Sequence, residues 1–176
     1  MKRLLPLIAL VTSVSFAQAQ SFVALLDGAQ DGGGTRMGSG LVNLTLTGTT
    51  LTLDGLFAGL SAGVTVAHIH GPGAPGVSVG TLYNLHGTHV PIGVTGGTIA
   101  GPPITLIDNP NGRGFTVAQQ LEQLNGGLWY VNIHNSTFPG GEIRGQILLV
   151  PEPSTLALAA LGLGGLVIWR VRRRAV

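Results

Sequence analysis

Residues 41–56 read LVNLTLTGTTLTLDGL, and this stretch decides the fold class of the chain. Apolar and polar side chains alternate from residue 41 to 47, and the alternation returns from residue 50 to 56. A period of two places the apolar side chains on one face of a strand and the polar ones on the other. Since Gly48 and Thr49 supply a turn between the two runs, the stretch predicts a β-hairpin with one buried face.

Short apolar or alternating runs, separated by turn-forming residues, continue on both sides of this hairpin. We expect further strands at residues 22–27, 64–70, 77–85, 94–99, 128–134 and 142–150. Many short strands in one chain are typical of a sandwich of two sheets. The sequence therefore predicts an all-β fold, an antiparallel β-sandwich of the Ig-like or superoxide-dismutase-like Greek-key type.

One short helix is expected within this β-rich segment. Thr116 and Gln119 have the spacing of a capping box, in which each side chain bonds the other residue's backbone N–H. Apolar residues at positions 117, 121 and 124 share one helical face, and the two glycines that follow end the helix.

Charge is divided unevenly along the chain. The full sequence has 9 Lys and Arg, 7 Asp and Glu, and a formal net charge of +2. Six of the basic residues lie in the two ends, so residues 20–150 keep three arginines against six carboxylates, a net charge of −3. We therefore expect no nucleic-acid partner. The absence of cysteine excludes disulfide bonds, so burial and backbone pairing must stabilise the domain.

The N-terminal 19 residues have the organisation of a secretory signal peptide. Lys2 and Arg3 precede an apolar run from residue 4 to 16, and Ala17 and Ala19 fit the small-x-small cleavage rule. We expect a short signal helix that is removed after Ala19. The mature domain would then begin at residue 20.

The last 26 residues form a second targeting segment, predicted at residues 151–176. Pro151, Glu152 and Pro153 lead into an apolar run at residues 156–169, and arginines follow at Arg170, Arg172, Arg173 and Arg174. A helix of 14 residues is about 21 Å long, whereas the bilayer core is about 30 Å thick. We expect a weak hydrophobic helix with its arginines on the cytoplasmic side.

This tail resembles the bacterial PEP-CTERM sorting signal in the order of its three parts. The resemblance implies export, an intermediate held transiently in the inner membrane, and cleavage near the Pro-Glu-Pro motif by an exosortase-type transpeptidase. It also implies a Gram-negative bacterium that makes exopolysaccharide or biofilm, with the processed protein at the cell surface or in the matrix. The alternative is an ordinary single-pass tail anchor.

Two sequence blocks resemble the CHRD domain, a module named from chordin and found in secreted bacterial proteins. The first is AHIHGP at residues 67–72. The second is LWYVNIH at residues 128–134, followed by FPGGEIRGQI at residues 138–147. The resemblance covers most of residues 20–150 and implies an extracellular β domain.

Histidines are the candidate metal ligands of this domain. His68 and His70 are two residues apart on a predicted strand, so both leave the same face, and His134 ends a later strand. Imidazole suits copper or zinc, and the arrangement is similar to that of Cu/Zn superoxide dismutase. The alternative is that these side chains hydrogen-bond backbone carbonyls. We expect this structural role and no stoichiometric metal, because no fourth ligand is evident near His86, His89 or elsewhere.

Three classes of function remain open. The first is a non-catalytic surface or matrix protein, structural or adhesive in exopolysaccharide, and we expect this one because the targeting signals are strong and catalytic motifs are few. The second is a copper- or zinc-binding domain with redox activity like that of superoxide dismutase. The third is an extracellular module that binds a protein ligand.

The expected partners are the export machinery, the exosortase, and exopolysaccharide or matrix proteins. Glu142 and Arg144 share one face of the last strand, and we expect them to pair structurally, with each other or with a neighbouring strand.

Overall fold

A computed structural model describes residues 19–32, 34–151 and 170 of the chain. Within these residues no helix is both long and apolar enough to cross a membrane. Ala19 and Pro151 are exposed and lie just outside the first and last strands, and Arg170 is exposed and helical. The other predicted sorting residues and both targeting helices fall outside the described residues, namely Ala17, Glu152, Pro153, Arg172, Arg173 and Arg174.

The described chain consists of short strands with one α-helix and one 3₁₀ turn. The elements are β1 (Gln20–Asp27), β2 (Ser39–Thr47), β3 (Thr50–Ala58), β4 (Val64–His70), β5 (Thr81–Asn84), β6 (Gly97–Ala100), β7 (Ile104–Thr105), η1 (Pro110–Gly112), α1 (Val117–Asn125), β8 (Tyr130–Asn135), β9 (Ile143–Gln146) and β10 (Leu148–Leu149). The all-β fold predicted from the sequence is confirmed.

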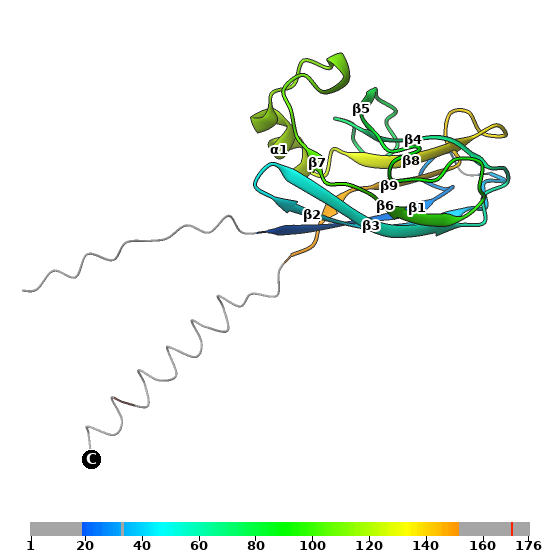
Figure 1. The fold of residues 1–176 in the computed structure, drawn as a ribbon, viewed down its shortest axis with the longest axis horizontal. Helices are drawn as coiled ribbons and strands as arrows, with labels where there is room; N and C mark the ends of the chain where they lie inside the picture. Colours follow the sequence, from blue (N-terminus) through cyan, green and yellow to red (C-terminus); the bar gives the residue numbers. More distant parts are fainter. Residues whose placement is uncertain (1–18, 33, 152–169, 171–176) are drawn as a thin grey trace, which may run out of the picture.

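The strands form one antiparallel sheet that curls into two facing layers. Its order is β5-β4-β8-β9-β1-β2-β3-β6, with β10 paired to β1 and β7 paired to β3. Figure 1 shows β4 and β8 in one layer and β1, β2 and β3 in the other. The layers join through the single pair Asp27 and Arg144 between β1 and β9. The chain crosses between layers from β3 to β4 and back from β5 to β6.

The predicted hairpin is formed by β2 and β3. Val42, Leu44 and Leu46 are buried, whereas Asn43 and Thr47 between and beside them are exposed, as the alternation requires. Their side chains enter the core between the two layers.

The predicted last strand, 142–150, is divided in two. β9 pairs with β8, and β10 pairs with β1, so the chain changes partner at Ile147. The Ile147 side chain is fully buried, and its N–H bonds the carbonyl of Trp129 at 2.8 Å. A change of partner is a tertiary event, and no local pattern in the sequence announces it.

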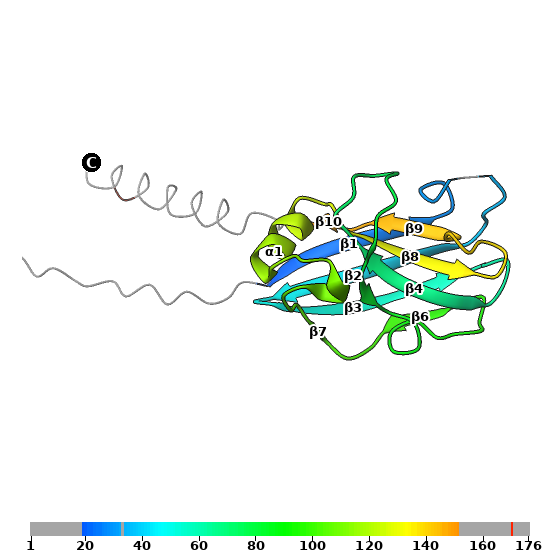
Figure 2. The same cartoon turned by 90° about the horizontal axis from the view of Figure 1, so that it is seen from above.

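Helix α1 begins and ends where its caps predict. The Thr116 hydroxyl accepts a bond from the Gln119 N–H at 3.3 Å, and the Gln119 side chain accepts one from the Thr116 N–H at 2.9 Å. Leu124 is fully buried, and Gly126 caps the C-terminus. The helix lies at one end of the layers, beside β10 (Figure 2).

Candidate metal centre

The sheet alternation places three histidines on the outer face of one layer. Ala67 and Ile69 of β4 are fully buried in the core, so His68 and His70 point to the opposite side. On β8, Val131 and Ile133 face the core, and His134 faces outward for the same reason.

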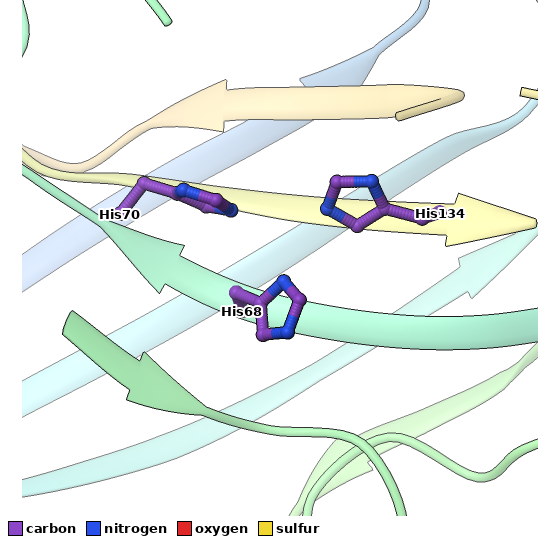
Figure 3. Close-up of side chains that lie close together, drawn as sticks. All are labelled: His68, His70 and His134. Atoms are coloured by element: carbon purple, nitrogen blue, oxygen red, sulfur yellow. The ribbon is translucent and has the colours of Figure 1, made fainter. Parts of the chain in front are cut away.

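The pairing of β4 with β8 brings these three residues together. Val66 lies opposite His134, His68 opposite Asn132, and His70 opposite Tyr130. Neighbouring strands are about 4.8 Å apart, so imidazoles on one face of two adjacent strands come within contact distance. Figure 3 shows the three rings gathered over β4 and β8.

Two loops cover this outer face. In residues 71–80, the carbonyl of Val79 accepts a bond from His70 Nδ1 at 2.8 Å, and the Val79 N–H donates to the Tyr130 hydroxyl at 3.0 Å. In residues 135–141, the carbonyl of Pro139 accepts a bond from His134 Nδ1 at 3.0 Å. His70 and His134 are therefore buried, and His68 is half-buried, although all three point away from the hydrophobic core.

The ring nitrogens of the three histidines converge. One ligand nitrogen from each of His68, His70 and His134 lies within 4.8 Å of the other two. The ring centroids of His68 lie 5.3 Å from His70 and 5.2 Å from His134. Three buried ring nitrogens have no hydrogen-bond partner in the described structure: His68 Nδ1, His70 Nε2 and His134 Nε2.

The backbone bonds fix which nitrogen is free. A carbonyl only accepts, so Nδ1 of His70 and of His134 must carry the proton. In a neutral ring, Nε2 then keeps its lone pair, which is the form that binds a metal. The predicted bonds to backbone carbonyls are present for these two histidines, but they account for only one nitrogen of each ring.

The surroundings favour neutral imidazoles. Burial lowers the pKa of His68 to about 4, with further lowering by the charges of His134, His70 and His86. Burial also lowers the pKa of His70 and of His134, against the opposing effect of their bonds to Val79 and Pro139. At neutral pH the three rings therefore offer lone pairs and not positive charges.

The spacing is close to that of a bound ion. Ligand nitrogens about 2.0–2.1 Å from a tetrahedral metal lie about 3.4 Å from one another. The ligand nitrogens of the three histidines lie within 4.8 Å of one another, somewhat farther apart than around a bound ion. Small side-chain rotations would bring them to the shorter distance. The site would supply three nitrogen ligands and leave a fourth position open.

The remaining two histidines do not join this group. His89 bonds the Pro102 carbonyl through Nε2 at 2.8 Å and the Thr88 hydroxyl through Nδ1 at 3.0 Å, so both of its nitrogens are satisfied. His86 packs edge-on against His68, with 5.4 Å between centroids, and its Nδ1 lies 3.3 Å from the Ala67 carbonyl.

Several polar neighbours were missed by the sequence analysis. Tyr130 stacks on His70 with 4.9 Å between ring centroids and 4° between planes. The Arg144 guanidinium carbon lies 3.4 Å from the centre of the Tyr130 ring. Burial raises the pKa of Asp31, against the lowering effect of Arg36, His134 and Arg144. Alternation along β8 could have predicted that Tyr130 lies near the histidines, because it is four residues before His134 and therefore on the same face.

Glu142 and Arg144 have different partners. The Glu142 carboxylate accepts bonds from the Ser61 N–H at 2.9 and 3.0 Å, from the Ser61 hydroxyl at 3.0 Å, and from the Asn135 amide. In the described part of the chain, no hydrogen bond joins it to Arg144. Glu142 thus ties the start of β9 to the loop before β4 and to the end of β8. Of the two expected pairings, the structure has the one with a neighbouring strand.

Comparisons with known families agree with both sequence resemblances. A family model for the CHRD domain matches residues 22–147, and a model for the PEP-CTERM protein-sorting motif matches residues 149–174. No curated protein and no solved structure matches the chain. All three converging histidines lie within the matched CHRD segment.

Proposed function

The chain belongs to the CHRD domain family, and from this premise we propose that its domain binds one copper or zinc ion through His68, His70 and His134. The PEP-CTERM motif makes it an exosortase-sorted extracellular protein, exported through a membrane-anchored intermediate to the cell surface. The ion would therefore be bound outside the cytoplasm. This proposal departs from the structural role that the sequence favoured for the histidines.

The observation that carries the proposal is that His68, His70 and His134 bring ligand nitrogens within 4.8 Å of one another, and that each has a buried ring nitrogen with no hydrogen-bond partner among the described residues. A buried nitrogen without a partner costs free energy, roughly 1–3 kcal/mol. Three such nitrogens at one place are difficult to explain as structural side chains, since each could have been satisfied or replaced by an apolar residue. A shared metal ion would satisfy all three at once.

The ligand set restricts the metal. Three imidazoles and no thiolate or carboxylate suit copper or zinc better than magnesium or calcium, which prefer oxygen. The carbonyls of Val79 and Pro139 act as outer-shell partners, since they hold the rings in the metal-binding tautomer.

Metal analysis of the chain purified without a histidine tag tests this proposal. After loading and dialysis we expect one copper or zinc ion per chain, and a Tm that rises with added metal. His70→Ala and His134→Ala should each abolish both effects, whereas His89→Gln should keep the ion because His89 has other partners. Wild-type protein without stoichiometric metal after loading, or retention of the metal by His70→Ala or His134→Ala, would contradict the proposal.

We propose, as a second function, that the domain is a non-catalytic structural or adhesive component of exopolysaccharide or biofilm. The supporting observation is a row of polar pairs across β2 and β3: Asn43 opposite Asp54, Thr45 opposite Thr52, and Thr47 opposite Thr50. These residues lie on the outer face, and most are exposed. Hydroxyl, amide and carboxylate groups on an exposed strand face suit hydrogen bonding to sugars.

Co-sedimentation of the purified protein with exopolysaccharide from the producing cells tests this second function. We expect retention that weakens when Thr45 and Thr52 are both changed to Val. Absence of retention would contradict the adhesive role. Superoxide dismutation by the copper-loaded protein would contradict the proposal that the domain is non-catalytic.

A further inference from the structure

Arg144 lies on the same covered face as the three histidines. It is opposite Asn132 of β8, which is in turn opposite His68 of β4. Two strand spacings, about 10 Å, therefore separate the backbones of Arg144 and His68, a distance that a long side chain can largely bridge. Arg144 is only 1% exposed, because the loop at residues 71–80 also covers it.

The positive charge of Arg144 has no direct counter-charge in the described structure. Its NH2 group donates to the Ala74 carbonyl and to Gln146 Oε1, both at 3.4 Å, and its Nε has no partner. Within the described residues no hydrogen bond or ion pair joins Arg144 to a carboxylate. Asp31 is near enough to Arg144 to interact electrostatically, and its Oδ2 has no hydrogen-bond partner among the described residues. A buried guanidinium without a bonded anion is costly.

Stacking links the guanidinium to His70 through the Tyr130 ring. Arg144 lies against the Tyr130 ring, and that ring lies against His70. The two contacts restrict the side chain, so its position relative to His70 is set before any ligand arrives. A guanidinium that is fixed in advance binds a carboxylate or similar anion with little further loss of entropy.

A bound metal ion and Arg144 would both attract an anion, against the opposing negative charge of Asp31, which acts on His134 and on Arg144. Three neutral imidazoles would leave a divalent ion with its full charge and an open fourth position. Building on the proposed metal centre, we propose that this open position, together with Arg144, is a subsite for a small anion. One atom of the anion, a carboxylate or an inorganic anion of similar size, bonds the metal, and another accepts a hydrogen bond from the guanidinium.

Azide binding to the copper(II)-loaded full chain, purified in detergent, tests this inference. Binding of azide to copper(II) is followed by visible absorption. A charge-assisted hydrogen bond contributes enough that Arg144→Gln should weaken azide binding about tenfold or more. Arg144→Lys should weaken it less, because the charge remains while the planar fork is lost. Arg170→Gln is the matched control: Arg170 is exposed and lies outside the CHRD segment at residues 22–147, and its loss should leave azide affinity within about twofold.

The outcomes separate this inference from the proposed function. If the wild-type chain binds no copper, both are wrong. If copper is retained and Arg144→Gln binds azide like the wild type, only the anion subsite is wrong, and Arg144 is a structural residue that a bridging water satisfies. If neither Arg144 variant folds, competition in the wild type decides. Formate should displace azide while uncharged formamide does not, and equal displacement by the two, or none by formate, overturns the subsite.

Discussion

Acid should destabilise the metal-free domain between pH 7 and pH 5 through His68. Burial and three neighbouring histidines lower the pKa of this ring from 6.5 to about 4. In the unfolded chain the ring takes up a proton as the pH falls through 6.5, whereas the folded domain resists protonation until about pH 4. The unfolded state thus binds more protons in this window, so stability is fully present above pH 6.5 and is lost on acidification.

The pKa difference sets the size of this effect. Linkage between protonation and unfolding gives a loss of about 1.8 kcal/mol from pH 7 to pH 5 for His68 alone. The ring is half-buried, and contact with solvent screens its charge, so we expect about 1 kcal/mol. The lowered pKa values of His70 and His134 act in the same direction.

Urea unfolding of residues 20–150 in the presence of a chelator, at pH 7 and at pH 5, measures this loss. His68→Gln removes the titrating group while keeping a polar side chain of similar length. The variant should lose about 1 kcal/mol less than the wild type over the same pH interval. Equal losses in the two proteins would refute the argument, because the destabilisation would then arise from other groups.

Three further predictions concern stability and processing. Ile133→Ala should destabilise the domain by about 2–5 kcal/mol because Ile133 is fully buried, whereas Leu25→Ala at a 62% exposed position should cost far less. Midpoints of urea unfolding measure both costs, and similar costs would refute the assignment of Ile133 to the core. Thr116→Ala should cost about 0.5–2 kcal/mol by removing the helix cap, and an unchanged Tm would show that the cap contributes nothing. Intact mass should show a mature protein running from about Gln20 to near Pro153, and a steady-state product that keeps the whole C-terminal tail would contradict the predicted processing.

Local patterns were sufficient for the elements that depend on neighbours in sequence. The alternation at residues 41–56 predicted β2 and β3, and the capping box at Thr116 predicted the start of α1. Residues 64–70 were predicted as a strand and form β4 with the same bounds. In each case the deciding interaction spans a few residues, so the sequence contains it directly.

The histidine site was only half predictable. The spacing of His68 and His70 established that they share a face, since alternation in a strand is local. Their approach to His134 depends on the register between β4 and β8, which sets Val66 opposite His134 across a long stretch of chain. The covering by residues 71–80 and 135–141 also depends on tertiary contacts. It buries three ring nitrogens that have no hydrogen-bond partner in the part of the chain that the structure describes.

The sequence by itself determined the fold class, the capped helix, the CHRD and PEP-CTERM resemblances and the presence of a histidine pair on one strand face. Only the tertiary structure decided that His134 completes a group of three and that Arg144 lies buried with no hydrogen bond to a carboxylate of the described residues. The physical reason is that alternation and capping are fixed by bonds within a few residues. Strand register and loop covering are fixed by the free energy of packing segments that are far apart in the chain.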